Sequence, residues 1–272
     1  SEQYYFSVNE KEPKPKLIKK RQRGVLYSVN SWNGKFYNHT NENAEDFKID
    51  ISDSLEQSDW KTFIASKEEV LIGSLTFLKN WIIRSETSNA LDKLFVQNIA
   101  TRKEEELIFS DENVFVPSVS LMQRDRDTNE IYLGYSSPKT QARVYTYNLE
   151  TKEKKLVKEQ KIPSGHNPED YIVERVDCKS HDERLVPLTI TRHKNTKLDG
   201  SAHLLLYGYG SYGSSMSPCF STTRLSLINR DIIWVTAHIR GGMERGMKWW
   251  KEGKLLNKKN TFEDYIASAK YL

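Results

Sequence analysis

The residues most suggestive of chemistry lie in a glycine-rich loop at 204–213, which reads LLLYGYGSYG. Gly208, Gly210 and Gly213 follow an apolar run and spell G-x-G-x-x-G, the pattern of a dinucleotide-binding turn. In such a turn the backbone N–H groups at a helix N-terminus hold a pyrophosphate. A nucleotide cofactor is therefore the first hypothesis.

Three features of the surrounding sequence argue against a nucleotide. Pro218 disfavours a helix that starts directly after the glycines. Asp231, the acid that would bind a ribose, precedes the next apolar run and so lies at the wrong end of that strand. The loop also carries Tyr209 and Tyr212 where the backbone would have to approach phosphate closely. We expect neither a nucleotide nor any other cofactor.

Acyl transfer fits the same loop better. In an α/β-hydrolase, glycines let the backbone fold back at the mouth of the site, where a donor stabilises an oxyanion. A tyrosine hydroxyl can serve as this donor, and the loop contains two tyrosines. The structural alternative is a glycine-rich turn with packed tyrosines and no chemistry.

A nucleophile for this chemistry is absent from the sequence. No G-x-S-x-G elbow occurs, and Ser211 in G-S-Y-G is one residue out of frame. His238, at the end of an apolar run, is the histidine expected nearest the site, with a structural or substrate-lining role. No H-E-x-x-H spacing occurs, and Cys178 and Cys219 support neither a disulfide framework nor a metal site.

A repeat organises the chain before this loop. The segments 94–108 and 144–157 each contain an alternating strand, a polar turn and a second strand, with Asn98 aligned to Asn148. Looser copies precede them at a period of roughly 40–50 residues, which is typical of four-stranded β-propeller blades. Three whole units and half of a preceding one predict a partial propeller of about three and a half blades.

A different pattern begins after a Pro- and Gly-containing linker near Lys161. We expect a hairpin around 181–182, an apolar strand entering the glycine-rich loop, a helix at Thr222–Arg230 and a second apolar strand at Asp231–His238. Strand, helix, strand and helix in this order predict a parallel α/β sheet. The fold class is therefore mixed β and α/β.

The last predicted helix has an apolar face and an apparent start signal. Thr261 followed three residues later by Asp264 predicts a capping box, with Thr261 as the N-cap.

Composition excludes several functional classes. The net charge is +4 with acids and bases interleaved, and the basic run at 14–23 predicts a solvated segment rather than a nucleic-acid site. No apolar run approaches the ~18 residues of a membrane span, and no signal-peptide core begins the sequence. We expect no nucleic-acid or membrane partner and a cytoplasmic location.

Several motifs resemble the prolyl oligopeptidase family of serine peptidases, and its oligopeptidase B branch in particular. They are YGYGSYG at 207–213, RLSLINRDIIWVTAHIRGG at 224–242 and WWKEGKLLNKKNTFEDYIASAKYL at 249–272. The propeller strands at 39–49 and 131–140 are also similar. The resemblance covers essentially the whole chain.

The resemblance implies a fold, a site and a substrate class. It implies that 1–162 is the C-terminal part of a seven-bladed propeller, and that 163–272 is the first half of an α/β-hydrolase domain, ending before the nucleophile elbow. It assigns an oxyanion hydroxyl to Tyr209 and places the IRGG turn at the same site. We expect the substrate-binding residues to be Tyr212, Arg240, Gly241 and Gly242.

The turn departs from the family pattern, R-G-G-G-E-x-G with an aliphatic residue before the last glycine. Met243 replaces a glycine and Arg245 an apolar residue. A side chain at 243 conflicts with the positive φ or the close packing that a glycine allows there.

The resemblance implies an oligopeptidase that cleaves short peptides after Lys or Arg. Because the Ser, Asp and His of a triad are missing, we expect the chain to be inactive alone. It is alternatively one half of a split enzyme completed by a second chain, or a non-catalytic propeller-type binding fragment. A nucleotide-binding protein is the weakest alternative.

Overall fold

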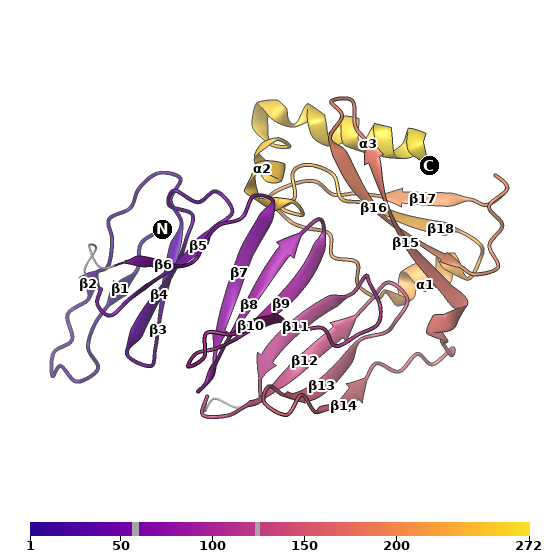
Figure 1. Ribbon diagram of the computed structural model, residues 1–272. Coiled ribbons are helices and arrows are strands. Elements are labelled where there is room, and N and C mark those ends of the chain that lie inside the picture. The colour runs from indigo at the N-terminus through magenta and orange to yellow at the C-terminus, as the bar shows by residue number, and fades with distance from the viewer. Residues whose placement is uncertain (56–59, 123–125) are drawn as a thin grey trace.

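Short antiparallel strands dominate the first part of the computed structural model, which describes residues 1–55, 60–122 and 126–272 (Figure 1). In chain order they are β1 (Tyr4–Tyr5), β2 (Lys16–Leu17), β3 (Tyr27–Trp32), β4 (Lys35–Thr40), β5 (Lys48–Ser52), β6 (Lys61–Ile64), β7 (Val70–Phe77), β8 (Trp81–Ser88), β9 (Leu91–Asn98), β10 (Glu104–Glu106), β11 (Val116–Leu121), β12 (Glu130–Ser136), β13 (Arg143–Asn148) and β14 (Lys154–Glu159).

These strands form the predicted propeller-like blades. β3–β6, β7–β10 and β11–β14 each make a four-stranded antiparallel sheet in sequence order, and β1 pairs with β2 ahead of them. Figure 1 shows the three sheets side by side, fanned about a common direction. The predicted fold class, blades followed by an α/β portion, is confirmed.

The repeat has a common turn at its two clearest copies. Asn98 Oδ1 accepts the N–H of Thr101, and Asn148 Oδ1 accepts that of Thr151, each at 3.0 Å. The next residues, Arg102 and Lys152, both have a positive φ, of 60° and 63°. Because Asn side chains hydrogen-bond backbone two or three residues ahead, the aligned asparagines predict this turn chemistry.

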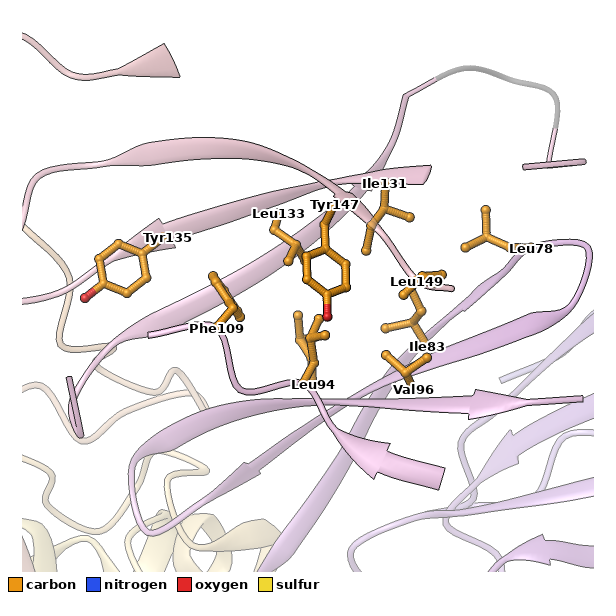
Figure 2. Packing of buried hydrophobic residues seen from close by; sticks show 11 residues of the cluster. Leu78, Ile83, Leu94, Val96, Phe109, Ile131, Leu133, Tyr135, Tyr147 and Leu149 are labelled. Carbon is orange, nitrogen blue, oxygen red and sulfur yellow. The ribbon is translucent and has the colours of Figure 1, made fainter. Parts of the chain in front are cut away.

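Apolar side chains that alternate along the strands fill the space between the second and third blades (Figure 2). The buried residues of this cluster are Leu78, Ile83, Leu94, Val96, Leu107, Phe109, Ile131, Leu133, Tyr135, Tyr147 and Leu149. Since a blade cannot bury both faces alone, contact with its neighbour forms this core.

The second part combines one mixed sheet with short helices. Its elements are η1 (Pro168–Asp170), β15 (Tyr171–Lys179), β16 (Leu185–His193), β17 (Leu204–Tyr207), α1 (Thr222–Ile228), β18 (Ile233–Ala237), α2 (Gly246–Lys251), η2 (Leu255–Asn257) and α3 (Lys259–Tyr271). The sheet order is β15-β16-β18-β17, and only the pair β17–β18 is parallel among the described strands. The predicted hairpin around 181–182 is confirmed as β15–β16, and the predicted parallel pairing holds for β17–β18, whereas β16 joins β18 in antiparallel orientation.

The predicted capping box at the last helix is wrong. α3 begins two residues earlier, at Lys259, so Thr261 lies inside its first turn. The Thr261 hydroxyl donates to the carbonyl oxygens of Arg240 and Gly253, and Asp264 is fully buried against Arg240. Tertiary contacts, rather than helix capping, occupy both side chains.

The propeller part caps a helix of the second part. Asp46 Oδ1 accepts the N–H of Met247 at 2.6 Å, in the first turn of α2, while Oδ2 accepts the N–H of Glu69. Arg245, the N-cap residue of α2 itself, provides no side-chain cap. Asp46 therefore ties a propeller loop to α2, a role that nothing in the sequence pattern signals.

We expect Asp46→Ala to lower the free energy of unfolding by about 1–2 kcal/mol, because two backbone donors at a buried contact lose their acceptor. Urea titration measures this loss, and faster amide exchange at Met247 locates it. Glu45→Ala, which removes an exposed ion pair with Lys251, is the matched control and should cost less than about 1 kcal/mol. Equal effects of the two variants would contradict the capping role.

Candidate functional site

The candidate site lies at the carboxyl ends of the parallel strands β17 and β18. In open α/β sheets, ligands bind in the crevice outside these strand ends. The loop 208–213 leaves β17, and the turn 238–246 leaves β18. Gly213 N–H donates to the carbonyl oxygen of Gly241 at 2.9 Å, which joins the two segments.

The glycines allow these two backbone segments to pack closely against each other. A Cβ on Gly241 would lie 2.0 Å from the carbonyl oxygen of Gly210, and one on Gly253 would lie 2.2 Å from the nitrogen of Gly241. Gly210 itself has a φ of 59° and is buried against Thr261 and Ile239. The spacing that resembles a nucleotide-binding turn therefore reflects loop-on-loop packing.

The two tyrosines of the loop are both accessible. Tyr209 is 44% exposed, and its hydroxyl has no hydrogen-bond partner among the described residues. Tyr212 is 89% exposed and has a φ of 56°, a conformation uncommon for an aromatic residue. Strain of this kind persists where surrounding contacts hold the backbone in place.

Lys258 provides one of these contacts. Its ammonium group donates to the carbonyl oxygen of Gly210 and, at 2.7 Å, to the hydroxyl of Ser211. Burial lowers the pKa of Lys258. Tyr265 on α3 also donates its hydroxyl to the Leu206 carbonyl oxygen at 2.7 Å, so Lys258 holds the loop and α3 holds the strand.

Arg240 was expected in the substrate-binding set, but its side chain faces the interior. The guanidinium is 1% exposed and donates to Asp264 at 2.6 Å and 2.9 Å and to Asp182 at 2.6 Å and 3.1 Å. Despite desolvation, these carboxylates raise the pKa of Arg240. The arginine positions the turn, and Gly241 and Gly242 follow it as buried residues.

The residues around Arg240 include a group with the composition of a metal site. His181, Asp182 and Asp264 place ligand atoms within 4.8 Å of one another. Because the Arg240 guanidinium already neutralises both carboxylates, the group is an ion-pair network.

The two departures from the family turn have specific contacts. Met243 is not among the residues with positive φ, and its side chain packs over Gly213, where an added Cβ would lie 2.4 Å from the Met243 methyl group. Arg245 donates to Glu69 of the propeller part at 2.5 Å and 3.0 Å. The replacement by Arg245 thus adds a contact between the two parts.

Two buried titratable groups flank the turn. His238 is fully buried with Nε2 2.8 Å from the Thr189 hydroxyl, and burial together with Arg175 lowers its pKa to about 3. Such a histidine stays neutral and is unsuited to act as a general base. Burial raises the pKa of Glu244 to about 7, and Asp92 adds to the shift, whereas the Met216 N–H donated to Glu244 opposes it.

A hydrolytic centre would also need a nucleophile. Ser211, the nearest serine to Tyr209 in the loop, accepts a hydrogen bond from Lys258, and no histidine bonds it within the described part of the chain. Among the described residues, this loop therefore offers the accessible Tyr209 hydroxyl but no serine that is hydrogen-bonded to a histidine.

Comparison with known proteins agrees with this geometry. A family model described as "Prolyl oligopeptidase, N-terminal beta-propeller domain" matches residues 1–160, and one described as "Prolyl oligopeptidase family" matches residues 218–272. The chain belongs to the prolyl oligopeptidase family. The resemblance found in the sequence motifs is thereby confirmed.

Curated relatives in this family are peptidases. The chain is 34% identical to Dipeptidyl aminopeptidase BI of Pseudoxanthomonas mexicana and 31% identical to Protease 2 of Moraxella lacunata. Each match covers 94% of this chain but only 35% and 36% of the relative. The chain therefore spans about a third of the length of these relatives.

Solved structures of the prolyl oligopeptidase family superpose on the whole chain. Oligopeptidase B from Leishmania major matches with a TM-score of 0.89, and oligopeptidase B from Trypanosoma brucei with 0.92, both at 27% identity. Each match covers 100% of this chain and 40% of the structure. None of the helices in the described ranges is long and apolar enough to span a bilayer.

Proposed function

We propose that this chain supplies the oxyanion-donor side of a serine oligopeptidase site that hydrolyses short peptides after Lys or Arg. The accessible, unpartnered hydroxyl of Tyr209 carries the proposal, because it stands on a loop that Gly210, Gly241 and Lys258 hold at the carboxyl end of β17. A preorganised donor of this kind stabilises the charge that develops on a carbonyl oxygen during acyl transfer.

The remaining site residues have contributory roles in this proposal. Tyr212 contacts the substrate with its exposed ring, and Gly241 lets the turn, which includes Gly242, pack closely against the substrate-facing loop. Arg240 acts from the interior by holding the turn. The proposal also divides the chain into a propeller part at 1–162 and a hydrolase part at 163–272. The proposed location is cytoplasmic.

The isolated chain is proposed to be inactive. An oxyanion donor stabilises an intermediate that only an activated nucleophile can generate. The Ser, Asp and His of the triad are then contributed from outside this sequence, and a second chain is one source.

A fluorophosphonate probe tests the inactivity directly, since it labels an activated serine. We expect no labelling of the purified chain and no hydrolysis of an arginyl reporter amide. Labelling at any serine of the chain would refute the proposal.

Mixing the chain with the C-terminal hydrolase segment of a relative tests the donor role of Tyr209. We expect an arginyl reporter to be cleaved by the mixture, and Tyr209→Phe to lower kcat by about 10²-fold with KM little changed. Tyr207→Phe removes an exposed hydroxyl at the end of β17 and is the matched control. Similar rates for the two variants would exclude Tyr209 as the donor.

The same mixture tests the substrate preference. Relatives named prolyl endopeptidase make proline the competing preference, and the name Dipeptidyl aminopeptidase BI suggests action at a free amino terminus. Prolyl and arginyl reporters, each with a free and an acetylated amino terminus, separate these possibilities. Faster cleavage after proline would contradict the Lys/Arg proposal.

A further inference from the structure

A cavity of about 480 Å³ opens beside the candidate donor loop. Ser211 and Tyr212 line it together with Trp250 of α2 and with Gly253, Lys254, Leu255 and Lys258 from the connection between α2 and α3. The cavity thus adjoins the carboxyl end of β17, where ligands bind in sheets of this type. Its volume is within the usual range for small-ligand sites, about 300–1,000 Å³.

Two aromatic rings form walls of this cavity. The backbone before Tyr212 is held by Lys258, which donates to Gly210 and Ser211. Trp250 is half-buried under Lys254, whose ammonium nitrogen lies 3.2 Å from the ring centroid. Exposed aromatic walls with fixed backbones can hold an apolar side chain at little entropic cost.

The charged residues that line the cavity are all cations. Two lysines, Lys254 and Lys258, line it together with Trp250, Leu255 and neutral loop residues, and none of the lining residues is acidic. Lys258 donates to neutral oxygens, and neither lysine forms an ion pair with a described carboxylate. An anion entering the cavity would therefore meet cations whose charge is not already neutralised.

A larger cavity between the second and third blades lacks this asymmetry. It has a volume of about 740 Å³ beside β14, and cations and acids both line it. Its Arg143 pairs with Glu159 at 2.6 Å, and its Lys139 lies 3.6 Å from Glu169. Charge complementarity therefore favours the smaller cavity as a ligand site.

We propose that the cavity between Tyr212 and Trp250 binds a carboxylate of a short peptide, with Lys254 pairing the carboxylate and the two rings holding an apolar side chain. The inference rests on the proposed function for the peptide as substrate class. Short peptides offer a terminal carboxylate close to any bond that is cleaved, whereas a bond within a folded protein does not. An anchor of this kind would favour short substrates.

Binding without turnover tests the proposal on the chain as it stands, so a failure of hydrolysis leaves the result unaffected. Isothermal titration compares acetyl-Ala-Phe, its C-terminal amide, and acetyl-Phe-Asp-amide, which has only a side-chain carboxylate. We expect acetyl-Ala-Phe to bind about tenfold more tightly than its amide. Binding of acetyl-Phe-Asp-amide at the level of acetyl-Ala-Phe supports a general carboxylate site, and weaker binding supports one specific for the C-terminus.

Matched variants assign the effect to Lys254. Lys254→Gln should lower the affinity for acetyl-Ala-Phe to that for its amide. Lys259 is an exposed cation nearby on α3, and Lys259→Gln should leave the affinity for acetyl-Ala-Phe unchanged. Tyr212→Ala should weaken the acid and the amide by the same factor, because both have the phenyl ring. Equal binding of acid and amide, an equal loss in both lysine variants, or no binding of any peptide would overturn the proposal.

Discussion

Replacing Arg240 with methionine is expected to lower the free energy of unfolding by about 3–5 kcal/mol. The change leaves Asp264, which is fully buried, without its cation, and it removes the hydrogen bonds to Asp182. A buried carboxylate without a partner pays a desolvation cost that packing does not offset. Urea titration at pH 7 measures the loss.

A second substitution distinguishes the stability lost through the buried charge from the stability lost through packing. In Arg240→Met/Asp264→Leu the uncompensated carboxylate is gone, so we expect at least half of the lost stability to return. A double variant no more stable than Arg240→Met would show that the ion pair is not the source of the effect.

Glu244→Gln is expected to stabilise the protein by about 3 kcal/mol at and above pH 7, with no gain below pH 4.5. Burial raises the pKa of Glu244 from 4.5 to about 7, with a further contribution from Asp92. The folded state therefore binds this proton more tightly than the unfolded state. The stability that it contributes is present below pH 4.5 and is lost as the pH rises to about 7.

The difference in unfolding free energy between wild type and Glu244→Gln isolates the contribution of Glu244. His238 has a lowered pKa and acts in the opposite sense, so its contribution is lost as the pH falls below 6.5 in both proteins. Glu68→Gln, which removes an exposed carboxyl, is the control and should show no such pH-dependent gain. Urea midpoints between pH 4 and pH 8 provide the measurement, and a pH-independent difference would contradict the assignment.

Local pattern determined most of the blades. Alternating apolar residues in β9 and β12 place every second side chain in the core, and Asn98 and Asn148 mark equivalent turns. These features depend on residues two to four positions apart, which the chain order displays directly. The repeat could therefore be recognised from the sequence.

Pairing between distant segments was less predictable. The apolar strands β16, β17 and β18 look alike in sequence. In the folded chain, however, β16 pairs with β18 in antiparallel orientation and β17 pairs with β18 in parallel orientation. Thr261 and Asp264 have capping-box spacing, yet contacts to Arg240 and Gly253 define their roles. A short motif does not show which distant groups will compete for its side chains.

The order of residues along the chain was enough to recognise the repeated blades and the family motifs, and it marked Tyr209 as a candidate donor. Only the tertiary structure decided that Arg240 turns inward, that Asp46 caps α2, and that the cavity beside Tyr212 has unpaired cations. The physical reason is that burial and charge pairing depend on groups far apart in the chain. Residue type and spacing fix local geometry, whereas the dielectric environment and the partner of each charge exist only once the segments pack together.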